Sequence, residues 1–277
     1  MTIRIGRILA AVAAIGLTAT SAQAHRQWML PSATSLSGDD VWVTVDAAIS
    51  NDLFYFEHFP MRTDNIKAWF PDGSEAKIEN AATGRYRSTF DVHLTQKGTY
   101  KIANVTTGVM GSYKLNGTET RLPRGTTKEQ LATVIPAGAT DVQVSESSGR
   151  NEIFVTSGEP TDGVLKPTGQ GLEMQPITHP NDLVVGEDAR FRFLADGKPA
   201  ANLEIEVVPG GVRYRDQLND RKVTTDANGE VTISWPEPGM YWLNASIGGG
   251  RGAPGAAPAA APAKRMSYVT TLEVQAP

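Results

Sequence analysis

The sequence of 277 residues contains no cysteine. This absence excludes disulfide bonds, thiolate metal sites and a lipid anchor attached through a cysteine. Basic residues are not clustered either, because no run of Lys and Arg exceeds two adjacent positions and the formal net charge is −4. Proteins that bind nucleic acids need a basic stripe or patch, so we do not expect this class of function.

Long hydrophobic runs are absent except near the start of the chain. There, Arg4 and Arg7 precede an apolar stretch over residues 8–17, and Ser-Ala-Gln-Ala follows at residues 21–24. This order is typical of a secretory signal peptide, and the stretch is shorter than the about 20 residues of a membrane span. We therefore expect a signal peptide over residues 1–24 and a periplasmic protein without membrane insertion. Its first mature residue would be His25.

Helical periodicity is scarce. Only residues 127–133 predict a short helix, which Thr126 and Glu129 would cap. Elsewhere apolar residues alternate with polar ones, which is typical of strands that are buried on one face. Clear examples are residues 41–45, 90–94, 190–193 and 203–207. The predicted fold class is all-β, built from antiparallel β-sandwiches.

The alternating strands fall into two similar halves. In each half, a strand leads through a glycine turn to a tyrosine and a further strand, with Tyr100 in the first half and Tyr241 in the second. Immunoglobulin-like sandwiches place a tyrosine corner at such a position. We predict two tandem immunoglobulin-like modules, residues 25–165 with an insert and residues 176–277, joined by a linker at 166–175. The Gly, Ala and Pro stretch at 248–263 predicts a flexible loop.

Signatures of hydrolytic enzymes are missing from the sequence. It contains no G-x-S-x-G elbow, no H-E-x-x-H helix and no P-loop. Acidic residues are abundant, but no pair of them can be singled out as an acid and a base. We therefore predict no catalytic residue and expect a protein that is not an enzyme.

The four histidines are the main candidates for metal chemistry. Removal of the signal peptide would give His25 a free α-amine beside its imidazole, so that one residue could chelate an ion. A second imidazole would complete the three-nitrogen arrangement called a histidine brace, which suits Cu(II) or Ni(II). His58 is the best candidate for this second imidazole. Alternatively, His58 belongs to an aromatic core strand and only hydrogen-bonds a backbone carbonyl.

Three further residues are candidate metal ligands. Glu57 and Met61 lie close to His58 in the sequence, and His179 lies in a Thr-His-Pro loop at the start of the second module. A role as a turn residue is the alternative for His179. The remaining histidine, His93, alternates out of phase with the apolar residues of its strand, so we expect it to be exposed rather than a ligand.

The start of the predicted mature chain resembles a known family. Residues 25–31, His-Arg-Gln-Trp-Met-Leu-Pro, are similar to the His-x-x-Trp-Leu-x-Pro opening of the periplasmic domain-of-unknown-function 4198 family. Residues 57–60, Glu-His-Phe-Pro, resemble its Gly-His-x-Phe-Pro segment, and residues 171–176, 196–199, 225–229 and 238–239 resemble its second half.

Some members of this family are associated with nickel or cobalt uptake. The resemblance therefore implies metal handling and a ligand role for His58. Some members carry another histidine in the strand after the Pro-Gly turn, but residues 241–246 of this chain contain none. This difference leaves His25 and His58 as the centre of the predicted site.

Three functions are compatible with these observations. The first is a periplasmic protein that binds a transition metal ion, Ni, Co or Cu, and supports its uptake with a membrane metal transporter or a TonB-dependent receptor as partner. The second is a non-catalytic envelope interaction or scaffold module, for which His25 is irrelevant. The third is a copper oxidase with a histidine brace, which would also need a surface shaped for its substrate.

Overall fold

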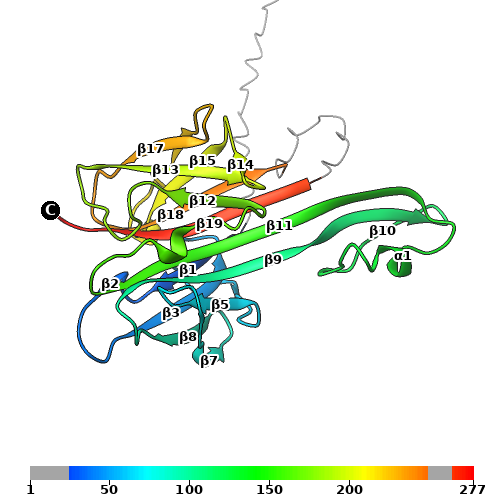
Figure 1. Cartoon of the computed structure of the whole chain (residues 1–277). Coiled ribbons are helices and arrows are strands. Elements are labelled where there is room, and N and C mark those ends of the chain that lie inside the picture. Colours follow the sequence, from blue (N-terminus) through cyan, green and yellow to red (C-terminus); the bar gives the residue numbers. More distant parts are fainter. Residues whose placement is uncertain (1–24, 249–263) are drawn as a thin grey trace, which may run out of the picture.

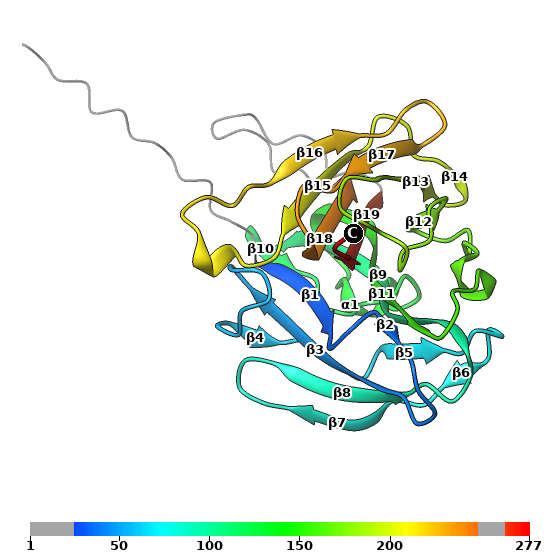
Figure 2. The same cartoon turned by 90° about the vertical axis from the view of Figure 1, so that its left-hand side faces the viewer.

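The computed structural model describes residues 25–248 and 264–277. The predicted signal peptide over residues 1–24 and nearly all of the loop predicted at 248–263 lie outside the described residues. Within them, the chain forms three β-sheets and very little helix (Figures 1 and 2). The prediction of an all-β, immunoglobulin-like sandwich fold is confirmed. No helix in these two segments is long and apolar enough to cross a membrane.

The three sheets differ in size. The five-stranded sheet contains, in spatial order, β1 (Arg26–Pro31), β3 (Trp42–Ser50), β8 (Ser88–His93) and β7 (Glu79–Thr83), and β4 (Phe59–Pro60) pairs with β3. The four-stranded sheet contains β12 (Leu172–Pro176), β13 (Asp188–Ala195) and β14 (Lys198–Pro199), and β17 (Glu230–Ser234) pairs with β13.

The ten-stranded sheet runs through the whole molecule. Its spatial order is β16 (Arg221–Thr224), β15 (Glu204–Pro209), β18 (Gly239–Ile247), β19 (Lys264–Val274), β11 (Thr140–Ser157), β9 (Gly98–Leu115), β5 (Ile66–Trp69) and β6 (Glu75–Ala76). In addition, β10 (Thr118–Arg121) pairs with β9 and β2 (Ser35–Leu36) pairs with β11. The helical elements are α1 (Leu131–Val134) and the 3-10 turns η1 (Gly163–Leu165) and η2 (Val212–Tyr214).

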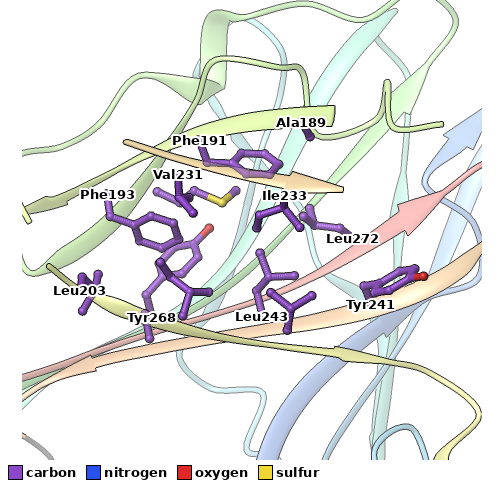
Figure 3. Packing of buried hydrophobic residues seen from close by; sticks show 14 of the residues in the cluster. Ala189, Phe191, Phe193, Leu203, Val231, Ile233, Tyr241, Leu243, Tyr268 and Leu272 are labelled. Atoms are coloured by element: carbon purple, nitrogen blue, oxygen red, sulfur yellow. The ribbon is translucent and has the colours of Figure 1, made fainter. Parts of the chain in front are cut away.

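Two sandwiches share this long sheet. The five-stranded sheet packs against β5, β9 and β11 to form the first sandwich, and the four-stranded sheet packs against β15, β18 and β19 to form the second. Parallel pairing of β11 with β19 joins the two halves of the sheet. Phe191, Phe193 and Tyr268 are fully buried in the core of the second sandwich (Figure 3).

The two cores lie on opposite faces of the shared sheet. Consecutive side chains of a strand point to opposite faces. In β11, Ile153 and Val155 belong to the core of the first sandwich, whereas Phe154 between them belongs to the core of the second. Figure 1 accordingly shows the five-stranded sheet below β11 and the four-stranded sheet above it. The other face of the second half is covered by the edge of the five-stranded sheet, where Trp28 of β1 and Ala48 of β3 pack against Val208, Trp242 and Val269, whereas no sheet covers the other face of the first half.

The linker predicted at residues 166–175 differs from the structure. Residues 172–176 form strand β12, in which Leu172 and Met174 are 1% and 3% exposed. Burial of these apolar side chains in the core of the second sandwich stabilises the strand. The connection between the sandwiches therefore ends at Gly171, which has a positive φ of 71°.

The two tyrosine corners are present. The Tyr100 hydroxyl donates to the carbonyl oxygen of Gln96 at 3.0 Å and accepts the Gln96 N–H at 2.7 Å. In the second sandwich, the Tyr241 hydroxyl donates to the carbonyl oxygen of Glu237 at 2.8 Å. Both side chains are buried, at 0% and 2% exposed. The similarity of the two halves that the sequence suggests is confirmed at these positions.

The predicted insert is a long projecting arm. Strands β9 and β11 have 18 residues each and extend far beyond the sandwiches, with β10 and α1 near their far end (Figure 1). A small apolar cluster centred on Val109, Tyr113 and Leu122 holds this end together. The helix predicted at 127–133 is wrong in its bounds, because α1 is only Leu131–Val134. The Thr126 hydroxyl bonds the Pro123 carbonyl instead of capping a helix.

Candidate functional site

The structure brings His25 and His58 together at one end of β3. Strand β1 pairs with β3 on one side, where Arg26 lies opposite Ser50. Strand β4 pairs with the same end of β3, where Phe59 lies opposite Ile49. The residue that precedes each strand is a histidine, and the two imidazole rings are in edge contact, with centroids 4.2 Å apart and an interplanar angle of 60°.

The start of β1 is fixed by contacts with the second sandwich. Arg26 is 8% exposed, and its guanidinium lies 3.2 Å from the Glu206 carboxylate and 5.6 Å from the centre of the Trp242 ring. The Trp242 indole N–H donates to the carbonyl oxygen of Gln27 at 3.0 Å. His25 is exposed, but the residues that follow it are held firmly, so its backbone position is determined.

A groove runs beside His25 between the two sandwiches. It has a volume of about 400 Å³, and its wall includes His25, Gln27, Trp242 and Asn244. The His25 ring is therefore open to solvent and to small molecules. Phe59, which is 60% exposed, lies near both imidazoles, with ring centroids 6.3 Å from His25 and 6.0 Å from His58.

The two nitrogens of His58 differ in their surroundings. Nδ1 is buried without a hydrogen-bond partner among the described residues, although the ring as a whole is 30% exposed. The nearest carboxylate oxygen is Glu57 Oε1, at 3.7 Å from Nδ1. This oxygen accepts the backbone N–H groups of Asn51 at 2.7 Å and Asp52 at 3.0 Å. Glu57 is thus held in place beside the Nδ1 side of the imidazole.

Met61 and His179, the other two predicted ligands, have different surroundings from His25 and His58. Met61 is 3% exposed and packs in the core of the first sandwich. His179 Nε2 lies 3.0 Å from the Thr99 hydroxyl, and its Nδ1 accepts the Asn181 N–H at 3.1 Å. Burial lowers the pKa of His179. With both ring nitrogens within hydrogen-bond distance of partners, the half-buried His179 links the two sandwiches.

His93 is half-buried, with 33% of its side chain exposed, whereas its alternation predicts an exposed residue. Its ring is stacked on Trp42, with centroids 4.1 Å apart and an interplanar angle of 8°. Its Nε2 lies 2.8 Å from the Asp40 carboxylate. These contacts account for His93 without a metal.

The described residues contain no group of three or more His, Asp or Glu side chains placed to hold a metal ion. The pair of His25 and His58 brings two imidazoles together. The groove residues Glu206 and Trp242 were not predicted as part of the site. They lie far from His25 in the sequence, and only the sharing of one sheet by the two sandwiches brings them beside it.

Comparison with known proteins gives a family and a few distant structural neighbours. The model of a family described as "Domain of unknown function (DUF4198)" matches residues 22–249. No curated protein matches the sequence. Among solved structures, the D0-D1 domain of Intimin is 12% identical with a TM-score of 0.23, over 89% of this chain and 96% of that chain. The human OSCAR ligand-binding domain is 12% identical with a TM-score of 0.20, over 90% and 99%.

Proposed function

This chain belongs to the DUF4198 family, and we propose that it binds one transition metal ion, Ni, Co or Cu, at the start of β1 and handles it in the periplasm. The observation that carries the proposal is the edge contact of His25 and His58, whose rings are 4.2 Å apart. The proposal also requires cleavage of the predicted signal peptide after Ala24, so that His25 becomes the amino-terminal residue.

The donor set fits a borderline transition metal. The α-amine and the imidazole of His25 would chelate the ion, and His58 Nε2 would supply a third nitrogen. An α-amine has a pKa of about 7.7 to 8.0, so it loses its proton to a metal far more readily than a lysine does. Three nitrogen ligands suit Cu(II) and Ni(II), which favour tetragonal geometry.

Glu57 supports this site from behind rather than as a ligand. Its Oε1 atom is occupied by the N–H groups of Asn51 and Asp52 and lies beside His58 Nδ1. A carboxylate on this side favours the tautomer with a proton on Nδ1, which leaves the Nε2 lone pair for the ion.

The exposure of the site indicates transfer of the ion rather than permanent storage. His25 is at the surface beside an open groove, so an ion can enter and leave without opening the fold. A membrane metal transporter or a TonB-dependent receptor would be the partner that delivers or receives it. Structural metal sites are in contrast closed and fully coordinated by protein.

The test is titration calorimetry of the processed protein with Cu(II), Ni(II) and Co(II). The decisive variant carries one alanine before His25, which converts the α-amine of His25 into a peptide amide, moves the free amine one residue away and leaves both imidazoles in place. We expect affinity for the preferred ion to fall at least about tenfold in this variant and in His58→Gln. The matched control His93→Gln should bind as the wild type does.

Equal binding by the wild type and the extended variant would disprove the terminal chelate. It would favour the second candidate function, an envelope interaction module. The projecting arm supports that candidate, because Met110 in β9 is 53% exposed and Val142 in β11 is 46% exposed. These two apolar side chains are available for contact with another protein, although single exposed apolar residues are common on any protein surface.

A further inference from the structure

A second groove lies on the uncovered face of the shared sheet in the first sandwich. Its volume is about 650 Å³, larger than that of the groove beside His25. Lys67 and Trp69 of β5 and Lys101 and Ala103 of β9 form the floor. Ala103 is 1% exposed, and its short side chain leaves the floor hollow. The connection between the two sandwiches, residues 163–170, forms the wall.

One end of this wall is fixed to the first sandwich. The backbone N–H of Thr161 donates to the Thr99 hydroxyl at 2.9 Å, and the N–H of Thr99 donates to the Thr161 hydroxyl at 2.9 Å. Just beyond, Gly163 is pressed against Pro71, because a Cβ atom on Gly163 would lie 2.2 Å from the Pro71 carbonyl oxygen. The start of the turn η1 therefore packs directly against Pro71.

The other end of the wall is fixed by a buried carboxylate. Glu173 is 3% exposed and accepts the backbone N–H groups of Thr168 at 2.9 Å, Gly169 at 2.7 Å and Gln170 at 3.3 Å. Its carboxylate also lies 3.1 Å from the Arg150 guanidinium. With both ends held, the groove is formed before any ligand arrives, which lowers the entropy cost of binding.

The charge of the groove is opposite to that of the chain. Lys101 and Lys166 both line it, and neither has an ion-pair partner among the described residues. Lys67 is paired with Glu75 at 3.0 Å. The carboxylate in the lining, Asp64, is 64% exposed and paired with Arg62. The groove thus offers two free ammonium groups within a protein of net charge −4.

An aromatic platform lies next to these cations. The indole of Trp69 is half-buried in the floor, and the Lys101 ammonium lies 5.3 Å from the centre of its ring. The amide side chains of Asn65 and Gln170 also line the groove. Binding sites for small molecules combine such an aromatic surface with a few placed polar groups.

We propose that this groove binds an acidic glycan, a short sugar chain that carries carboxylates. The carboxylates would pair with Lys101 and Lys166 in charge-assisted hydrogen bonds. A sugar ring would lie against Trp69, and its hydroxyls would bond the amides of Asn65 and Gln170, which can both donate and accept. Nucleic acids fit less well, because they need many more cations than two.

The test uses tetragalacturonate as the probe and the processed full-length protein, in calorimetric titrations at low salt. Methyl-esterified tetragalacturonate has the same sugar backbone without the charges and serves as the control ligand. We expect the acid to bind at least tenfold more tightly than the ester. The double variant Lys101→Gln and Lys166→Gln should lose at least tenfold of that affinity, while Lys198→Gln, an exposed lysine in β14, should lose none.

Two results would overturn the proposal. One is equal binding of tetragalacturonate by the wild type and the double lysine variant. The other is equally tight binding of tripolyphosphate, which would show that any polyanion is accepted and that Trp69 contributes nothing. Trp69→Leu addresses the same point, and its circular dichroism spectrum must first match that of the wild type. Glycan binding should persist in the variant with an alanine before His25, because the two grooves are separate.

Discussion

The two faces of the shared sheet that lie outside the sandwich cores are covered in different ways. Beside His25, strand β1 lies over the second half of the sheet, and an apolar cluster that includes Trp28, Trp242 and Val269 fills the space beneath it. Beside Trp69, only the connecting segment covers the edge of the first half, and hydrogen bonds to Glu173 hold it.

This contrast suggests that the apolar cluster mainly contributes to the stability of the fold, and that the buried charge network mainly fixes the position of the connecting segment. Burial of apolar area contributes most of the free energy of folding and is tolerant of small shifts. A buried charge network contributes little net free energy, but breaking one partner leaves an unpaired charge and releases the segment that it held. We therefore expect the closure beside His25 to hold the sandwiches together, and the closure beside Trp69 to fix the shape of one groove.

Trp28→Ala should produce the largest effect. Trp28 is 0% exposed, packs between the sandwiches, and donates its indole N–H to the Ser50 hydroxyl at 2.7 Å. We expect the free energy of unfolding to fall by about 4 kcal/mol, measured by urea denaturation. Trp42→Ala, at a position 38% exposed, should cost less than about 1 kcal/mol. Equal losses in the two variants would show that the apolar cluster does not join the sandwiches.

Glu173→Gln should have the next largest effect. The change keeps the side-chain shape but removes one of the two carboxylates that face the buried Arg150, the other being Glu152 at 3.4 Å, and it brings an amide NH2 toward the backbone N–H groups of Thr168 and Gly169. We expect a loss of about 3 kcal/mol in urea denaturation. Glu204→Gln breaks an exposed pair with Lys222 at 2.8 Å and should cost less than about 0.5 kcal/mol.

The Glu173 variant also distinguishes the two grooves. If the carboxylate fixes the wall beside Trp69, limited proteolysis should cut residues 166–170 faster in Glu173→Gln than in the wild type. Metal binding at His25 should be unchanged, since the hydrogen bonds of β1 that involve side chains go to Asn51, Ser50, Glu206 and Trp242 and not to residues 166–170. Equal proteolysis of the two proteins would contradict the assigned role.

The two tyrosine corners allow a smaller comparison between the sandwiches. Tyr241→Phe removes one hydrogen bond and should cost about 1 kcal/mol. Tyr100→Phe also leaves the Gln96 N–H without its acceptor, so we expect about 2 kcal/mol. Thermal or urea unfolding of both variants measures the difference. A larger loss of stability in Tyr241→Phe than in Tyr100→Phe would show that the second hydrogen bond of Tyr100 does not contribute as expected.

The strands and turns of the fold could be predicted from the sequence, but the way in which the two sandwiches are joined could not. Alternation identified the strands around Val43, Phe90 and Phe191 because each strand is buried on one face, and the glycine turns located both corner tyrosines. The parallel pairing of β11 with β19 joins segments that are far apart in the sequence, and no local sequence pattern predicts this pairing. The sequence therefore predicts two separate tandem modules, whereas the structure has two sandwiches that share one sheet.

The same limit applies to the candidate site. The chemistry and the neighbouring motifs of His25 and His58 predict their role, and the pairing of β1 and β4 with β3 brings them together. Met61 followed His58 closely in the sequence, but its side chain is turned into the core. The groove beside Trp69 gave no sequence signal, because its lysines come from β9 and the connecting segment, which are distant in the chain.

The smallest predicted effect concerns His179, which joins the sandwiches through polar contacts alone. Burial lowers its pKa, partly opposed by the carboxylates of Asp162 and Asp182. In the unfolded chain a histidine has a pKa of about 6.5, so the unfolded state gains a proton first as the pH falls. The free energy of unfolding should therefore decrease as the pH falls below about 6.5. Protonation also places a hydrogen on Nδ1, which faces the Asn181 N–H.

Urea unfolding of the wild type and of His179→Gln between pH 7.5 and pH 5 measures this contribution. We expect the wild type to lose more stability over this range than the variant, because a glutamine at this position does not titrate. His93→Gln is the matched control, and its pH dependence should follow that of the wild type more closely than that of His179→Gln. Parallel curves for the wild type and His179→Gln would show that protonation of His179 does not weaken the junction, and would leave the apolar cluster around Trp28 as the contact that governs it.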